Sequence, residues 1–214
     1  MLVACWSVKG GSGTTVVAAA LGLLLAAGEQ DGVRLVDLGG DLPAALGIPD
    51  PQGPGVVEWL EAGDDVEVEA LDRLEVGAGP GLSLLARGVG PLSGAGGERL
   101  AAALAGGRHA VVDCGPPESP AGRAVAAAAG LSLLVVRPCY LALRRALAVP
   151  IRPSGVILVR EEGRSLGRRD VEAVLGVPVR AEVAWDASVA RHVDAGLLAG
   201  RLPRSLERAL RRAA

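Results

Sequence analysis

A glycine-rich segment near the start of the chain, residues 8–15, holds residue types that suit phosphate binding. It follows the apolar run 2–6, which predicts a buried strand, and precedes residues 16–27, whose Ala and Leu content predicts a helix. Glycines let a backbone turn tightly enough for several N–H groups to point at one anion. A helix N-terminus adds positive potential at the same point. The segment therefore predicts a phosphate-binding loop.

The same loop contains the only lysine of the chain, Lys9. All other basic side chains counted in the net charge are arginines, and asparagine is absent, which indicates a strong compositional bias. Because this bias favours arginine over lysine, chance alone would rarely place the single lysine inside the loop, and we interpret Lys9 as a functional residue. The alternative is a lysine that survives there by chance.

Length and composition limit the class of protein. A chain of 214 residues, half of it apolar, suits one α/β domain over residues 1–214. A net charge of −2 gives no general attraction to nucleic acid or anionic membranes. The three cysteines lack metal-ligand spacing, and no apolar run is long enough to span a membrane. We therefore expect a cytoplasmic protein with reduced thiols.

Strand and helix patterns alternate along the chain, and the strand runs are apolar throughout. This pattern predicts a single-domain α/β fold, a mostly parallel twisted sheet with helices on both faces. The predicted strands are 2–6, 33–37, 109–113, 131–136, 155–159 and 177–184, with a strand pair at 74–76 and 82–86. The predicted helices are 16–27, 55–62, 98–105, 119–129, 141–149, 166–175, 188–195 and 205–213. Ligands of such sheets bind at the carboxyl ends of the strands.

Two predicted strands end in an aspartate, Asp37 and Asp113, at the same edge of the sheet as the glycine-rich loop. A carboxylate at a buried strand end is costly without a partner, so we interpret Asp113 as a ligand-binding residue.

The loop resembles the deviant Walker A motif K-G-G-x-G-x-T of the ParA/MinD superfamily of P-loop ATPases. The resemblance implies that ATP is bound by Lys9, Gly10, Gly11, Ser12, Gly13, Thr14 and Thr15. It also implies that Lys9 is catalytic, reaching the nucleotide of the partner subunit in a face-to-face dimer, and that Thr15 coordinates Mg²⁺. The alternative is that Thr14 and Thr15 only cap the helix.

Thr14 stands where the family carries its second lysine, which contacts the β and γ phosphates. A threonine hydroxyl donates one hydrogen bond but brings no charge. The CpaE/TadZ branch, whose members position pili or secretion machinery, often shows a similar substitution. The chain looks closest to that branch.

Residues 35–47 resemble the first switch, V-D-x-D followed by a loop. Asp37 matches the first aspartate, which implies a catalytic and Mg²⁺-binding role, whereas the second position is Gly39. Asp41 is a candidate replacement for that second aspartate if the loop bends through the glycines. The alternative is that Asp41 N-caps a turn that begins at Pro43.

Residues 111–117 resemble the Walker B strand and second switch, h-h-D-x-P-P, in which Asp113 would hold Mg²⁺ through water. Gly115 inserts one residue before the prolines Pro116 and Pro117. Cys114 is expected to pack rather than react, since no His or second Cys is positioned for it.

The base pocket of the family is only partly matched. Arg160 falls where the family often has Asn-Arg, and residues 183–186 resemble its I-P-x-D loop, which places Trp185 near a base. Arg160 and Trp185 are therefore expected to bind the nucleotide. The alternative for Trp185 is a place in the core.

The C-terminal segment 201–212 is rich in arginine. MinD relatives end in a membrane-binding helix and ParA relatives bind DNA through basic residues, so contact with either is one interpretation. The apolar face is narrow: Leu206, Ala209, Leu210 and Ala213. We favour a solvated closing helix, because arginine stems readily cover apolar surface.

The resemblance implies an ATP- and Mg²⁺-binding switch that forms a nucleotide-dependent homodimer. The resemblance also implies a protein partner at the cell pole, septum or chromosome. We therefore expect a cytoplasmic protein that associates peripherally with the membrane or the nucleoid. Hydrolysis is expected to be slow or absent, because Thr14 and Gly39 replace two catalytic residues. The alternative is a degenerate, nucleotide-independent scaffold. An iron–sulfur reductase of this fold is disfavoured by the cysteine spacing.

Overall fold

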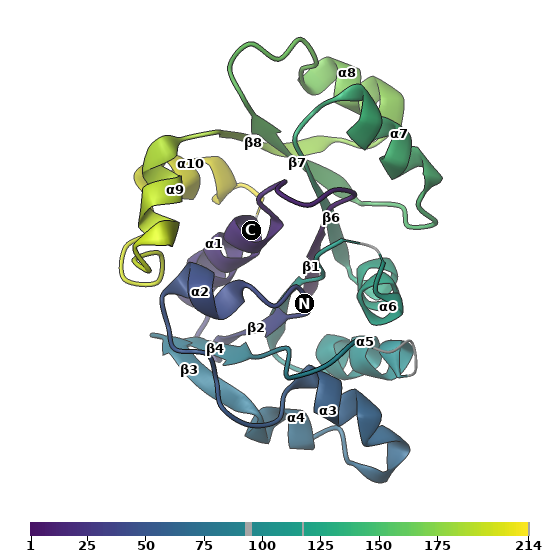
Figure 1. The fold of residues 1–214 in the computed structure, drawn as a ribbon, viewed down its shortest axis with the longest axis vertical. Helices are drawn as coiled ribbons and strands as arrows, with labels where there is room; N and C mark the ends of the chain where they lie inside the picture. The colour runs from purple at the N-terminus through teal and green to yellow at the C-terminus, as the bar shows by residue number, and fades with distance from the viewer. Residues whose placement is uncertain (93–95, 117, 214) are drawn as a thin grey trace.

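The chain folds into one mostly parallel sheet with helices on both faces (Figure 1). The computed structural model describes residues 1–92, 96–116 and 118–213. The eight strands lie in the order β3-β4-β2-β5-β1-β6-β7-β8, and only β3 and β4 pair antiparallel. The strands are β1 (Leu2–Trp6), β2 (Val33–Asp37), β3 (Glu75–Gly79), β4 (Leu82–Leu85), β5 (His109–Asp113), β6 (Leu131–Val136), β7 (Gly155–Arg160) and β8 (Val179–Ala184). The predicted fold class is confirmed.

The helices form two layers, which follow the division of the core into two clusters. One layer contains α3 (Val56–Glu61), α4 (Ala70–Arg73), α5 (Gly97–Gly106), α6 (Pro120–Ala128), α7 (Tyr140–Ala148) and α8 (Arg168–Leu175). The other contains α1 (Thr14–Ala26), α2 (Leu42–Leu46), α9 (Ala187–Asp194) and α10 (Arg204–Leu210). A short 3₁₀ helix, η1 (Gly63–Asp65), connects α3 to the segment before α4.

Strand β1 shows why the central strands are mainly apolar. Leu2 and Trp6 point into the core under α3 to α8, whereas Val3 and Cys5 point into the core under α1, α2, α9 and α10. Successive side chains of a strand face opposite sides of a sheet, so a strand that is covered twice needs apolar residues at every position.

The predicted elements match the observed ones apart from their ends. Helix α1 begins at Thr14, and β8 begins at Val179. The short helix α4 was not predicted, because its one buried residue, Leu71, leaves no periodic apolar pattern in the sequence. Of the motif 111–117, Pro117 lies outside the described residues.

A close backbone contact holds α2 in place beside the carboxyl end of β2. Gly47 ends α2 with a φ of 75°, and a Cβ built there would lie 1.9 Å from the Gly196 carbonyl oxygen. Any larger residue would push α2 away from the turn that follows α9. The position of α2, and of the loop that leads into it, therefore depends on Gly47.

The substitution Gly47→Ala should lower the free energy of unfolding more than Gly63→Ala. Both glycines have positive φ, so each alanine costs about 1–2 kcal/mol of backbone strain. Only position 47 adds a backbone clash, because a Cβ at Gly63 meets nothing within 4 Å. Urea denaturation of both variants measures the difference, and equal losses would contradict the contact.

Candidate functional site

The glycine-rich loop connects β1 to α1 at the carboxyl edge of the sheet. Gly11 and Gly13 have φ values of 74° and 89°, which only glycine adopts without strain. The Ser12 and Ser7 hydroxyls donate to the Lys9 carbonyl oxygen, at 2.8 and 3.2 Å, and fold the loop back on itself. Gly13 is the N-cap residue of α1, without a side-chain cap. The capping alternative for Thr14 and Thr15 is therefore wrong.

On one side of the loop lies a cavity of about 360 Å³, which we call the phosphate cavity. Its wall brings together three chain segments that end or follow parallel strands: the loop after β1, the loop after β2 and the loop after β5. The lining residues are Ser7, Gly10, Gly11, Ser12, Gly13, Thr14, Thr15, Val16, Gly39, Asp41, Ala45, Gly115 and Pro116. The predicted residues 10–15 are thus on one wall.

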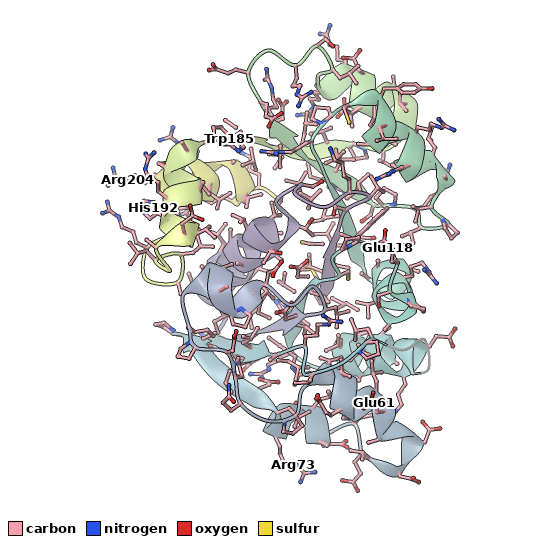
Figure 2. The ribbon with its side chains drawn as sticks, in the orientation of Figure 1. Glu61, Arg73, Glu118, Trp185, His192 and Arg204 are labelled. Carbon is pink, nitrogen blue, oxygen red and sulfur yellow. The ribbon has the colours of Figure 1, made fainter. Side chains whose placement is uncertain are left out.

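On the other side of the loop lies a cavity of about 140 Å³, which we call the side cavity. Gly11, Ser12 and Gly13 line it together with the ends of β7 and β8 and the start of α9. Trp185 forms part of its wall and is 53% exposed (Figure 2). The core alternative for Trp185 is therefore wrong, and its face is available to a flat ligand.

The structure does not bring the Arg160 side chain to either cavity. Its guanidinium pairs with Glu182 at 3.2 Å, and its carbonyl oxygen accepts the Trp185 N–H at 2.6 Å. Among the described lining residues of both cavities, Arg160 is missing. Its contribution is to hold the backbone of Trp185, and its nucleotide-binding role stays a prediction.

Asp113 ends strand β5 as a fully buried carboxyl group. Its Oδ1 accepts the Gly115 N–H at 3.0 Å, whereas Oδ2 has no hydrogen-bond partner of normal geometry in the described structure. Burial raises the pKa of Asp113, and the neighbouring Thr15 hydroxyl partly offsets this. A buried, half-paired carboxyl group next to a phosphate-binding loop is an uncommon and costly arrangement.

The Thr15 and Asp113 oxygens fit a magnesium ion. Mg²⁺ is held through one or two protein oxygens and completes its shell with water and substrate phosphates. The unpartnered Asp113 Oδ2 and the Thr15 hydroxyl supply such oxygens. No group of three or more His, Cys, Asp or Glu side chains suited to a metal occurs among the residues described.

Asp37 is the register partner of Asp113 across β2 and β5, and it is also buried. Its two oxygens accept the N–H groups of Gly40, at 2.6 Å, and Leu42, at 3.1 Å. Burial raises its pKa to about 6, and the charges of Asp113 and Asp41 add to this. Asp37 thus closes the loop after β2 and caps α2, while its catalytic and metal-binding roles stay predictions.

Asp41 occupies the N-cap position of α2, but its side chain makes no capping hydrogen bond. The capping alternative for its carboxylate is therefore wrong, since Asp37 caps α2 instead. The exposed Asp41 carboxylate lies on the wall of the phosphate cavity. Gly39 packs directly on Asp113: a Cβ built on Gly39 would lie 3.1 Å from Asp113 Oδ2.

Lys9 is exposed at the edge of the loop, and it lines neither cavity in the described structure. Its charge acts on Glu161, at the end of β7, whose pKa is lowered mainly by Arg164 and also by Arg137 and Lys9. Sequence reasoning missed Arg137, which lines the side cavity. The available signal was its position directly after the predicted strand 131–136.

The C-terminal helix α10 is a closing helix, as predicted. Leu206 and Leu210 are buried in the core cluster beside α1 and β8. Its apolar face is therefore occupied within the domain, while Arg204, Arg208 and Arg211 are exposed. Across the described chain, no helix combines the length and apolar character needed to cross a membrane.

Comparison with known proteins identifies the fold. The chain is similar to a ParA family ATPase from Chlorobium tepidum TLS, with a TM-score of 0.78 and 20% identity over 98% of this chain and 95% of that one. It is similar to MinD from Pyrococcus horikoshii OT3 complexed with Mg-ADP, with a TM-score of 0.79 and 18% identity over 99% and 94%. A further similar structure is the MinC:MinD complex of Aquifex aeolicus, with a TM-score of 0.76 and 19% identity over 99% and 93%.

No family model matches the sequence, and no curated protein matches it. At identities of 20% and below, the structural similarity establishes the fold: that of the ParA/MinD P-loop ATPases. The predicted ParA/MinD fold is confirmed, whereas the assignment of the loop as a deviant Walker A motif stays a prediction. The assignment to the CpaE/TadZ branch stays a prediction.

The substitution Asp113→Asn should raise the free energy of unfolding at neutral pH, because burial disfavours the charged carboxylate and the amide is neutral. It removes a buried charge, and Asp113 Oδ1 can still accept the Gly115 N–H. The control Asp41→Asn changes an exposed carboxylate of the same site and should have little effect. Chemical denaturation measures both, and a large loss in Asp113→Asn would contradict the role of the unpaired oxygen.

Stability should fall as pH rises through the window from about 4 to about 6, because native Asp37 binds its proton more tightly than the unfolded chain does. The full penalty of ionising Asp37, about 3 kcal/mol, is then present above this window. Asp113 contributes with the same sign. Asp37→Asn should flatten this part of the stability profile, measured by denaturation at several pH values. An unchanged slope would contradict the raised pKa.

Proposed function

We propose that this protein is an ATP- and Mg²⁺-binding switch that dimerises with nucleotide and positions a partner inside the cell. The observation that supports this most strongly is the buried Asp113 Oδ2 atom, which has no hydrogen-bond partner of normal geometry and lies near the Thr15 hydroxyl at the phosphate loop. A carboxyl oxygen buried without a partner is stabilised when a cation binds against it.

Different residues of the site would bind the phosphates, the Mg²⁺ ion and the base of a nucleotide. The residues of the loop and the N-terminus of α1 line the phosphate cavity, and their backbone N–H groups would bind phosphate oxygens there. Thr15 and Asp113 would hold Mg²⁺, which neutralises phosphate charge when it is bound. In the side cavity, the exposed face of Trp185 suits stacking on a nucleobase.

Three features support slow or absent hydrolysis. Thr14 brings no charge to the phosphates, and Gly39 has no side chain to orient a water molecule. Both oxygens of Asp37 already accept backbone N–H groups, so this carboxylate is committed to the loop after β2. Such a site suits a switch that reports bound nucleotide rather than a fast ATPase.

The proposed dimer follows from the position of Lys9. Its side chain is exposed and lies on neither cavity wall among the residues described, so it suits a nucleotide held by a second copy of the chain. The MinC:MinD complex supports a protein partner in general terms. We place the protein in the cytoplasm, at the pole, septum or chromosome, as a relative of the CpaE/TadZ kind.

A nucleotide-independent scaffold is the second candidate, favoured by the neutral Thr14 and by the absence of a carboxylate at Gly39. The two candidates differ in one measurable property. A scaffold of this fold should keep the same mass and stability with and without ATP and Mg²⁺.

ATP with Mg²⁺ should convert the wild-type protein from monomer to dimer, measured by light scattering during a nucleotide titration. Lys9→Ala should bind nucleotide but fail to dimerise, because its charge acts across the interface. Arg73→Ala is the control, since Arg73 is exposed on α4, far from Trp185 and the loop (Figure 2). No binding at millimolar ATP would contradict the function, and normal dimerisation of Lys9→Ala would contradict the crossing lysine.

A further inference from the structure

The two cavities beside the loop have an unusual shortage of positive charge for a phosphate site. The position of the usual loop lysine is Thr14, and Lys9 lies away from both walls. Among the described residues that line these cavities, Arg137 is the only basic one. A bound nucleotide would bring several negative charges next to this single guanidinium.

The topology places Arg137 directly beside the loop. It is the first residue after β6, which pairs with β1 on one side and with β7 on the other. The loop after β1 and the end of β7 are therefore its neighbours in space. Its side chain is 36% exposed and shares the wall of the side cavity with Gly11, Ser12 and Gly13.

One carboxylate orients Arg137 without consuming its hydrogen-bonding capacity. The Arg137 guanidinium contacts Glu161 Oε1 at 3.1 Å, while Arg164 contacts Glu161 Oε2 at 2.9 Å. A guanidinium has five N–H donors in a planar fork, so this contact leaves donors for a phosphate. Three cations, Arg164, Arg137 and Lys9, act on this one carboxylate and lower its pKa.

We propose that Arg137 is a nucleotide-binding residue that supplies, from the loop after β6, the positive charge that Thr14 does not bring to the phosphates. The proposal rests on the proposed function and adds a residue to the same site. Arg137 lines the side cavity and not the phosphate cavity, so it would reach a phosphate across Gly11, Ser12 and Gly13, which line both cavities. Positive charge on one side and the Mg²⁺-binding oxygens on the other would then hold the phosphates between them.

The test compares ATP affinity, by calorimetry with Mg²⁺, in Arg137→Gln and Arg164→Gln. Both variants remove a cation that pairs with Glu161, but only Arg137 lines a cavity beside the loop. Arg137→Gln should weaken ATP binding by about 10- to 100-fold, the range for a hydrogen bond to a charged group. Arg164→Gln should bind ATP like the wild type. Equal affinities of the two variants would overturn the proposal.

A second measurement distinguishes the loss of the Arg137 charge from a structural effect of the substitution. Adding Thr14→Lys to Arg137→Gln restores a cation to the phosphate cavity, and ATP affinity should recover. Adenosine, which has no phosphate, should bind the wild type and Arg137→Gln alike. A double variant as weak as Arg137→Gln, or an equal loss of adenosine binding, would overturn the proposal. Wild-type protein that binds no ATP would instead overturn the proposed function as well, which distinguishes the two failures.

Discussion

The Asp113 carboxyl group ends the central strand β5 out of contact with solvent, and its Oδ2 atom has no hydrogen-bond partner in the described structure. An unpaired buried acceptor of this kind costs about 1–3 kcal/mol. The neighbouring groups lie close around it: Thr15, in the first turn of α1, is beside it, and a Cβ built on Gly39 would lie only 3.1 Å from Oδ2. A cation bound against Oδ2 would offset this cost.

The strand order gives the site two sides that differ in the charged residues they carry. Strands β5 and β6 flank β1, so the residues that follow them lie on opposite sides of the loop. Asp37, Asp41 and Asp113 lie towards β2 and β5. The basic residues Arg137 and Lys9 lie towards β6 and β7, where the carboxylates of Glu161 and Asp186 are also found. A phosphate group with a divalent cation matches this division of charge, because the anion and the cation each meet their opposite.

Much of the fold was predictable, because mainly apolar runs define strands such as β2, β5 and β6, and β2 and β5 end in Asp37 and Asp113. The loop and Asp113 were predictable for the same reason. The sequence did not predict three features of the site: the position of Arg137, the backbone hydrogen bonds of Asp37 and the exposure of Trp185. Each depends on which loops converge in space, and a linear pattern does not record that convergence. Likewise, α4 is held by tertiary packing of Leu71 rather than by a local signal.

The most direct measurement is a crystal structure of the protein with a non-hydrolysable ATP analogue and Mg²⁺. The account predicts phosphates at the N–H groups of the loop, with Mg²⁺ bound to the Thr15 hydroxyl and contacting Asp113 Oδ2 directly or through one water. A nucleotide bound elsewhere, or phosphates at the loop with no cation between Thr15 and Asp113, would contradict it.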